Sequence, residues 1–174
     1  MSKKVLFILM PKDYRDEEFY FPYKILKNTG NHVDVAGFSE GEATGAKGYR
    51  HTPNLLLNNL SNEDFDQYDA LVIPGGPAST TYLWDNKKIQ SIVQYFHKKN
   101  KLVATICYAN IVPVQADILK NKKATVYPTQ EAKEILKKHD VEYVNAGCIK
   151  LDKENIITAQ GPKYAKEFGE TILL

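Results

Sequence analysis

The chain of 174 residues is long enough for one domain with a continuous core, and we expect a single domain over residues 1–174. Its composition, 43% hydrophobic and 25% charged, is average for a folded soluble protein, which argues against a disordered chain or a membrane protein. The formal net charge is +2 and lysines are spread along the chain beside acidic residues, so we expect no nucleic-acid partner and no membrane partner.

Apolar segments of strand length alternate with segments of helical periodicity in the first half of the chain, as is typical of an α/β protein with a largely parallel central sheet. The predicted helix is Glu17–Asn28, which Gly30 ends. Glycines mark a loop between residues 41 and 48, and a turn or short helix begins at Ser61. The predicted strands of this half are Lys4–Met10, His32–Phe38, Asn54–Leu57 and Ala70–Ile73.

The second half continues the alternation and ends in a hairpin and a helix. The hairpin joins Ile149–Leu151 to Ile156–Thr158 across a four-residue turn. A proline follows Gly161 and opens a final helix that runs to Leu173. The other predicted strands are Lys101–Ile106, Ala124–Tyr127 and Val141–Asn145. The other predicted helices are Asn86–Lys99, Ala109–Leu119 and Thr129–His139.

Cys107 and Cys148 are the two cysteines of the chain. Their contexts indicate separate strands rather than a disulfide. The N-terminal apolar run is too short for a signal peptide or a membrane helix. We therefore expect a cytoplasmic protein with reduced thiols.

Four loops follow apolar strands and form the expected ligand-binding edge, because open α/β sheets bind ligands beyond the carboxyl ends of their strands. Three of the four can build one site for covalent catalysis. The loops are Pro11–Glu18, Gly75-Gly76-Pro77, Cys107-Tyr108 and Gln160-Gly161-Pro162.

Cys107 stands where a strand passes into a helix, as in a nucleophile elbow that presents its side chain above the sheet. A helix N-terminus at this point would stabilise a thiolate and lower the pKa of the thiol. Free cysteines are also among the most buried and inert residues, so the position alone fits a nucleophile and a core residue about equally. Cys148 lies inside a predicted strand with no turn after it and is expected to be inert.

Gly75 and Gly76 can bring backbone N–H groups close to a substrate oxyanion, and the N–H of Tyr108 is a second candidate donor. A plain turn at the end of a strand explains the two glycines as well. The pattern is not the dinucleotide-binding glycine motif, and the four histidines show no metal-ligand spacing. We therefore expect no cofactor and no metal.

Glu17 and Glu18 fall in the first turn of a predicted helix, where acidic side chains interact favourably with the helix dipole. One of them could instead point at the thiol of Cys107. A carboxyl group buried beside a thiolate is pushed toward its protonated form and can then donate a hydrogen bond to the sulfur.

Five segments, in this order and at this spacing, resemble the ThiJ/PfpI superfamily over nearly the whole chain. They are "EFYFPYKILKNTG", "YDALVIPGGPAS", "KLVATICYA", "ILKNKKATVYP" and "IITAQGPKYAKEFGETIL". The group includes PfpI-type intracellular proteases and the Parkinsonism-associated redox protein. The resemblance implies a flavodoxin-like three-layer α/β sandwich, similar to class I glutamine amidotransferases, and a homodimer or larger homo-oligomer.

The resemblance also implies roles for the candidate residues. It favours Cys107 as the nucleophile or redox centre, selects Glu18 over Glu17 as its partner, and places the N–H groups of Gly76 and Tyr108 around the thiol. It suggests that Arg50 reaches the site of a neighbouring subunit.

Tyr108 departs from the family pattern, because PfpI-type proteases carry a histidine immediately after the cysteine. Tyrosine, with an ordinary pKa of about 10, is a poor base in that position. A glyoxalase-like or deglycase-like enzyme that acts on small reactive carbonyls is therefore the favoured function. A non-enzymatic redox sensor for stress is the first alternative. A protease or amidase is the second, and it requires a histidine from elsewhere.

Overall fold

The computed structural model describes residues 2–173 and is built around a seven-stranded sheet in the order β11-β12-β8-β7-β1-β3-β6. All neighbouring strands are parallel except β11, which pairs antiparallel with β12. The predicted α/β class, the mostly parallel sheet and the C-terminal hairpin are therefore confirmed. The strands are β1 (Lys4–Leu9), β3 (His32–Gly37), β6 (Leu55–Leu56), β7 (Ala70–Ile73), β8 (Leu102–Ile106), β11 (Cys148–Leu151) and β12 (Ile156–Ala159).

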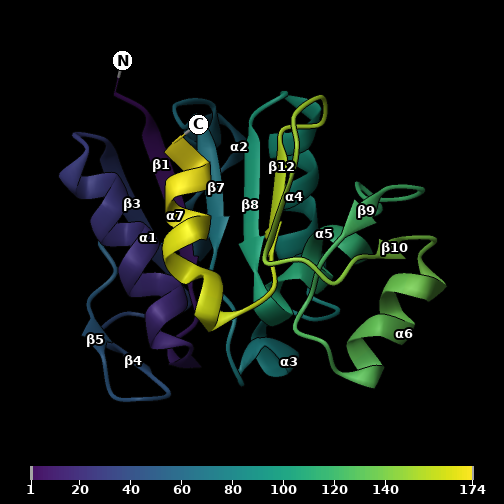
Figure 1. The fold of residues 1–174 in the computed structure, drawn as a ribbon. Helices are drawn as coiled ribbons and strands as arrows, with labels where there is room; N and C mark the ends of the chain where they lie inside the picture. Colours follow the sequence, from purple (N-terminus) through teal and green to yellow (C-terminus); the bar gives the residue numbers. More distant parts are fainter. Residues whose placement is uncertain (1, 174) are drawn as a thin grey trace.

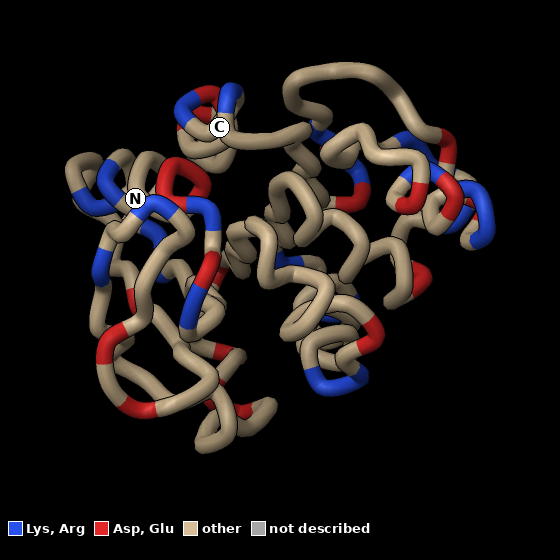
Figure 2. The backbone as a smooth tube through the Cα atoms, turned by 90° about the horizontal axis from the view of Figure 1, so that it is seen from below, with Lys and Arg blue, Asp and Glu red and all other residues tan. Residues whose placement is uncertain are grey.

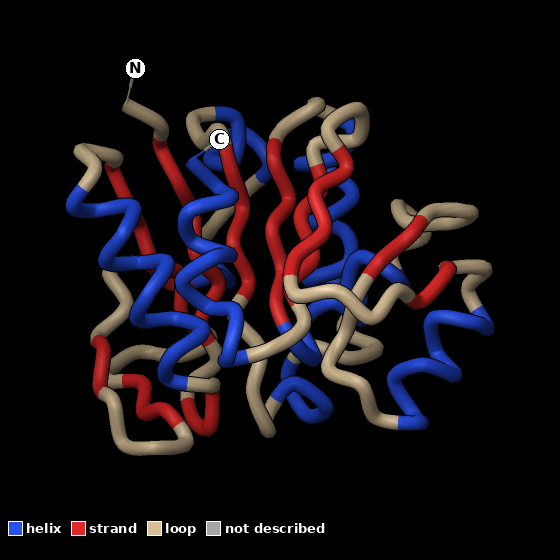
Figure 3. Tube along the Cα trace, in the orientation of Figure 1, coloured by secondary structure: helices blue, strands red, loops and turns tan. Residues whose placement is uncertain are grey.

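Helices cover both faces of this sheet and complete the predicted three layers (Figures 1 and 3). α1 (Asp16–Asn28) and α7 (Ala165–Leu173) pack together on one face, and α4 (Lys87–Lys98) and α5 (Ile111–Gln115) cover the other. α4 shows why these segments are helical, because its apolar residues recur every three or four positions and are buried. They are Ile89, Ile92, Val93 and Phe96. The short α2 (Asn62–Asp66) begins with a capping box on Ser61.

A small second sheet occupies a region where the sequence predicts only loops. It consists of β2 (Lys12–Tyr14), β4 (Ala43–Gly45) and β5 (Arg50–His51), in that order. These strands have two or three residues each, which is too short for an alternating pattern to be recognised. In Figure 1 this small sheet lies below the N-terminal half of the central sheet, next to the start of α1.

Several predicted boundaries are also wrong. The helix expected over Ala109–Leu119 begins as a tight 3-10 turn, Cys107–Asn110, and α5 ends at Gln115. The strands expected at Ala124–Tyr127 and Val141–Asn145 are reduced to β9 (Lys123–Ala124) and β10 (Glu142–Tyr143), which pair with each other outside the central sheet. The remaining helices are the short α3 (Ser79–Tyr82), which was not predicted, and α6 (Gln130–Lys138), which was.

Charges of both signs are interspersed along the chain when the molecule is viewed from the carboxyl ends of the strands (Figure 2). Over residues 2–173, the structure contains no helix with the length and apolar character needed to cross a bilayer.

Candidate active site

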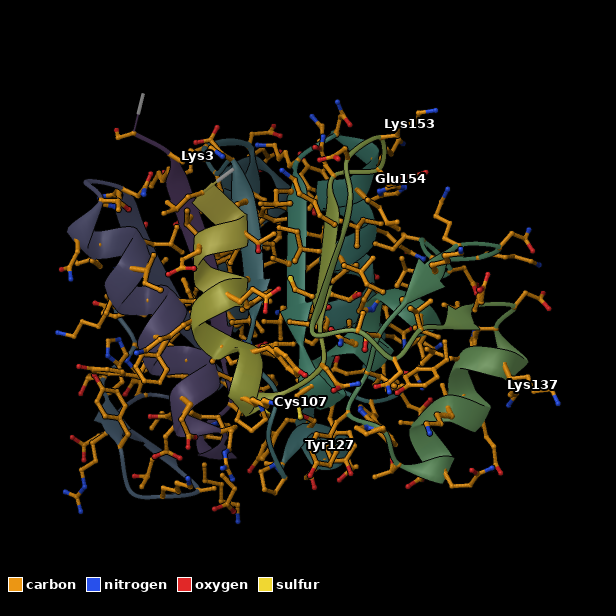
Figure 4. The ribbon with its side chains drawn as sticks, viewed as in Figure 1. Lys3, Cys107, Tyr127, Lys137, Lys153 and Glu154 are labelled. Atoms are coloured by element: carbon orange, nitrogen blue, oxygen red, sulfur yellow. The ribbon has the colours of Figure 1, made fainter. Side chains whose placement is uncertain are left out.

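Cys107 stands at the carboxyl end of β8, at the lower edge of the sheet in Figure 4. Its φ is 62°, a left-handed conformation that costs a non-glycine residue about 1–2 kcal/mol. This turn lifts the side chain out of the sheet while leaving it only 5% exposed. The backbone therefore has the geometry of the predicted elbow, and such strain is typical of functional positions.

Asn110 holds this turn in place from inside the protein. It is fully buried, and its amide nitrogen donates to the carbonyls of Thr125 at 2.8 Å and Ala159 at 2.7 Å. Its amide oxygen accepts a hydrogen bond from the Thr105 hydroxyl at 2.6 Å. One side chain thus connects the turn after Cys107 to β8, to β12 and to the segment after β9.

Replacing Asn110 by alanine is expected to reduce the free energy of unfolding by about 2–3 kcal/mol, because it leaves two buried carbonyl groups without a donor. Urea unfolding measures this loss. Asn145→Ala is the matched control, because its side-chain oxygen accepts hydrogen bonds at the exposed surface and its loss should cost much less. Equal losses in the two variants would contradict this account of Asn110.

Glu18 is the buried partner of Cys107. Its side chain is fully buried in the first turn of α1, and its Oε2 accepts a hydrogen bond from the Gly75 N–H at 2.9 Å. The Gly75 backbone lies between the two side chains, since a Cβ added there would be 3.0 Å from both Cys107 Cβ and Glu18 Oε2. Burial raises the pKa of Glu18 to about 8, against the lowering effect of its hydrogen bonds with Cys107 and Gly75.

The raised pKa of Glu18 should make stability depend on pH. In the unfolded chain this carboxyl ionises near its ordinary pKa of 4.5, whereas in the folded chain it keeps its proton up to about 8. Its contribution to stability is therefore complete below pH 4.5 and is lost as the pH rises to about 8. The loss is on the order of a few kcal/mol.

Glu18→Gln keeps a neutral, hydrogen-bonding side chain at all pH values. Urea unfolding at pH 5 and pH 8 should therefore show the variant gaining stability relative to the wild type as the pH rises. A constant difference between the two proteins across this range would rule out the raised pKa.

The thiol of Cys107 is not acidified in the way the sequence suggested. Burial is the main influence and raises its pKa well above the ordinary value, and an ionised Glu18 raises it further. Hydrogen bonds from the N–H groups of Tyr108 and Gly76 act in the opposite direction. The expected effect of a helix N-terminus is small here, because a 3-10 turn and not an α-helix follows Cys107. Protonation of Glu18 near neutral pH removes the charge that opposes a thiolate.

The predicted oxyanion donors divide into two kinds. The Gly75 N–H is already bound to Glu18, so the expectation that it serves a substrate oxygen is wrong. The N–H groups of Gly76 and Tyr108 face the sulfur instead. Gly76 has a φ of 129°, and a Cβ there would lie 2.3 Å from the backbone nitrogen of Arg15, so only glycine fits.

A pocket of about 210 Å³ opens above these groups. Tyr127 forms part of its wall and lies close to Cys107 (Figure 4). Tyr127 was not predicted as a site residue, because its segment was expected to form a strand. Arg15 lies in the predicted ligand-binding loop Pro11–Glu18, but it was not itself predicted as a site residue. The lining residues are Arg15, Glu18, Gly76, Pro77, Cys107, Tyr108, Tyr127 and Pro162.

Tyr108 lines this pocket with its ring held between two other aromatic side chains. Its ring meets those of Trp84 and Tyr127 edge-to-face, at centroid distances of 5.6 and 5.4 Å. The Trp84 indole donates to the Tyr108 carbonyl at 2.9 Å. The tyrosine therefore shapes the wall of the pocket. It occupies the position immediately after the cysteine, where PfpI-type proteases carry a histidine.

No histidine lines the pocket in the described part of the chain. His51 packs against the rings of Phe19 and Tyr23, at centroid distances of 4.8 and 5.1 Å. His32 and His139 pair with Asp34 and Asp117. His97 lies in the last turn of α4.

The remaining candidates lie away from Cys107. Glu17 forms ion pairs with Arg15 at 2.8 Å and Lys47 at 2.6 Å. Arg50 pairs with Glu42 at 3.3 Å and does not line the pocket of its own chain. Cys148 is a free thiol, as Cys107 is, and its pKa is raised mainly by burial.

Comparison with known proteins gives consistent matches along the whole chain. The model of the DJ-1/PfpI family matches residues 3–174. An uncharacterized protein of Methanocaldococcus jannaschii is 42% identical over 99% of this chain and 82% of its own length. A deglycase of Pyrococcus horikoshii is 36% identical over 88% of this chain and 84% of its own length. The crystal structure of Drosophila melanogaster DJ-1beta superimposes with a TM-score of 0.85 and 27% identity, over 99% of this chain and 89% of that one.

Proposed function

Because the chain belongs to the DJ-1/PfpI family, we propose that it is a cysteine-dependent enzyme that converts small α-oxoaldehydes, or their adducts with amines, into hydroxy acids. The observation that carries this proposal is the buried Cys107–Glu18 pair at the bottom of a small pocket without a histidine. A carboxyl group with a pKa of about 8 is suited to move protons near neutral pH. The name deglycase, carried by relatives from Pyrococcus species, supports the same chemistry.

The proposed reaction begins with attack of the Cys107 sulfur on the aldehyde carbon of methylglyoxal. A carbon–sulfur bond forms, the carbonyl double bond opens, and the thiol proton moves to the oxygen, giving a hemithioacetal. The N–H groups of Gly76 and Tyr108 face this position and can stabilise negative charge on the oxygen. With an amine adduct as substrate, the same carbon–sulfur bond forms while the carbon–nitrogen bond breaks and the amine leaves with a proton.

Glu18 then moves a proton between the two former carbonyl carbons. As a carboxylate it removes the hydrogen from the carbon bonded to sulfur, and as an acid it returns a proton to the neighbouring carbon. The hydroxyl proton on the first carbon passes to the oxygen on the second. The product is a lactate thioester of Cys107, in which one carbon has been oxidised and the other reduced. Water hydrolyses the thioester and restores the thiol. One carboxyl group and one thiol are sufficient for this sequence.

The proposal is tested by measuring lactate formed from methylglyoxal by the purified chain, by Cys107→Ala and by Cys148→Ala. We expect the wild type and Cys148→Ala to have similar rates, and Cys107→Ala to fall to the rate of buffer alone. Cys148 is the matched control because it is also a free, partly shielded thiol, and its sulfur donates a hydrogen bond to the Thr171 hydroxyl at 3.7 Å. Equal lactate formation by all three proteins would disprove the proposal.

A redox sensor is the second candidate function, and the protonated Glu18 favours it. A carboxyl group that keeps its proton up to pH about 8 can donate a hydrogen bond to a sulfinate formed when peroxide oxidises Cys107. Intact-mass spectrometry after mild peroxide treatment is expected to show addition of two oxygen atoms at Cys107 and none at Cys148. Random oxidation of both thiols would remove this candidate.

Assembly and location are further parts of the proposal. We expect a homodimer or larger homo-oligomer in the cytoplasm, with Arg50 near a neighbouring subunit. Light scattering on the purified chain measures the mass of the assembly, and a monomer would remove the role suggested for Arg50.

A further inference from the structure

Trp84 is the single tryptophan of the chain, and it supports a wall of the Cys107 pocket without lining the pocket itself. It follows α3, which lies against the turn of residues 107–110 (Figure 1). The Trp84 indole N–H donates to the Tyr108 carbonyl at 2.9 Å, and the two rings meet edge-to-face. Trp84 therefore holds the residue after the cysteine at two points, the backbone and the side chain.

The neighbours of Trp84 in the chain hold it in place. Leu83 is fully buried. Asp85 exchanges two hydrogen bonds with Gln115 of α5. The Asp85 backbone N–H donates to Gln115 Oε1 at 2.8 Å, and the Gln115 amide nitrogen donates to the Asp85 carboxylate at 2.9 Å. Because α5 begins where the turn of residues 107–110 ends, these contacts fix the indole relative to that turn.

The segment that ends at Trp84 begins at Gly76, the other residue whose N–H faces the sulfur. The Ser79 N–H donates to the Gly76 carbonyl at 3.1 Å, and the Trp84 N–H donates to the Ser79 carbonyl at 2.9 Å. Trp84 is thus linked through its backbone to Gly76 and through its side chain to Tyr108. Hydrogen bonds from the N–H groups of these two residues lower the pKa of the Cys107 thiol.

We propose that Trp84 is a positioning residue for the chemistry of Cys107, because its hydrogen bond to the Tyr108 carbonyl keeps the Tyr108 N–H directed at the sulfur and at an oxygen that becomes charged. An N–H group stabilises such a charge best when it is held in place before the reaction. Trp84 acts through Tyr108, since it does not line the pocket. The effect on the oxygen rests on the proposed function, whereas the effect on the sulfur applies to any reaction of the thiolate.

The test uses Trp84→Phe, which removes the indole N–H and keeps an aromatic ring against Tyr108. Trp84 is half-buried, and the Tyr108 carbonyl still accepts the N–H of Ile111 within the turn, so the variant should fold. Removal of an oxyanion donor costs about 100-fold to 1,000-fold in kcat, so displacement of one should cost less, on the order of tenfold. The KM for methylglyoxal should not change, because this hydrogen bond forms with the charged oxygen of the transition state.

Alkylation of Cys107 by iodoacetamide distinguishes positioning from a merely structural role. If the Tyr108 N–H stabilises the thiolate less well in Trp84→Phe, alkylation at pH 8 should slow by about twofold to tenfold, the range expected for one hydrogen bond. A variant that was only loosened would instead expose this buried thiol, and its alkylation would become faster. The two explanations therefore predict changes of opposite sign.

Gln94→Leu is the matched control, because the Gln94 side chain also donates to a backbone carbonyl, that of Ala116 at 3.0 Å, just beyond α5. It should leave kcat and the alkylation rate of Cys107 unchanged. Unchanged or faster alkylation in Trp84→Phe, an unchanged kcat, or the same changes in Gln94→Leu would each overturn the inference. Lactate formation by the wild type decides the proposed function independently, and alkylation decides the role of Trp84 even if no lactate forms.

Discussion

Replacing Glu18 by glutamine is expected to lower the rate of lactate formation from methylglyoxal by about 100-fold to 10,000-fold, the range that a general acid–base group contributes. Glutamine can accept the hydrogen bond from Gly75 and fills the same buried space, so the fold should persist. It cannot remove or return a proton, and the reaction should stop at the hemithioacetal. The readout is the initial rate with saturating methylglyoxal.

Two controls separate a loss of proton transfer from a general loss of structure. Glu17→Gln changes the neighbouring carboxyl, which pairs with Arg15 and Lys47 and does not itself line the pocket, and should leave the rate within a few-fold of the wild type. Alkylation of Cys107 by iodoacetamide should remain possible in Glu18→Gln. Above pH 8 it should be faster than in the wild type, because the charge that raises the pKa of the thiol is gone. Full activity of Glu18→Gln would remove Glu18 from the mechanism.

The second large effect is expected for Gly76→Ala, which should reduce the free energy of unfolding by about 2–5 kcal/mol. Left-handed backbone costs alanine about 1–2 kcal/mol, and overpacking adds about 1–3 kcal/mol. The new methyl group would lie 2.3 Å from Arg15 N and 2.7 Å from the Tyr14 carbonyl carbon, and backbone atoms cannot move aside cheaply. Urea unfolding measures the loss.

Gly48→Ala is the control for Gly76→Ala. Gly48 has a φ of 92°, but a Cβ at this position would have no heavy atom within 4 Å. Its cost should therefore be limited to the backbone strain of about 1–2 kcal/mol. If the two variants lose the same stability, the close approach of residues 14–15 to Gly76 is not what requires glycine there.

The elbow could be predicted because its signals are local. β8 is a mostly apolar run that ends immediately before Cys107, and the residues after the turn continue as buried apolar positions. The family resemblance selected Glu18 over Glu17 as the partner of Cys107, and the helical periodicity of α1 favours the same choice. Glu18, Pro22 and Leu26 recur every four residues and are all buried, whereas Glu17 lies off that stripe.

The rest of the site depends on contacts between segments that are distant in sequence. That the Gly75 N–H is bound to Glu18, 57 residues away, follows from how the turn after β7 meets the first turn of α1 and not from either segment alone. Tyr127 reaches the pocket because its segment leaves β9 as an extended loop, although its β-branched and aromatic neighbours resemble a strand. The small sheet of β2, β4 and β5 was missed for a related reason, since its pairing is set by the tertiary fold.

The assignment of Cys107 as the nucleophile is tested most directly by titrating the wild type with iodoacetamide. In each sample, the fraction of Cys107 that is alkylated is measured by peptide mass spectrometry, together with the remaining rate of lactate formation. Cys148 serves as an internal control. We predict that activity falls in proportion to the alkylation of Cys107, reaches zero when every chain is modified there, and does not depend on Cys148. Activity that persists after complete alkylation of Cys107 would contradict the proposed mechanism.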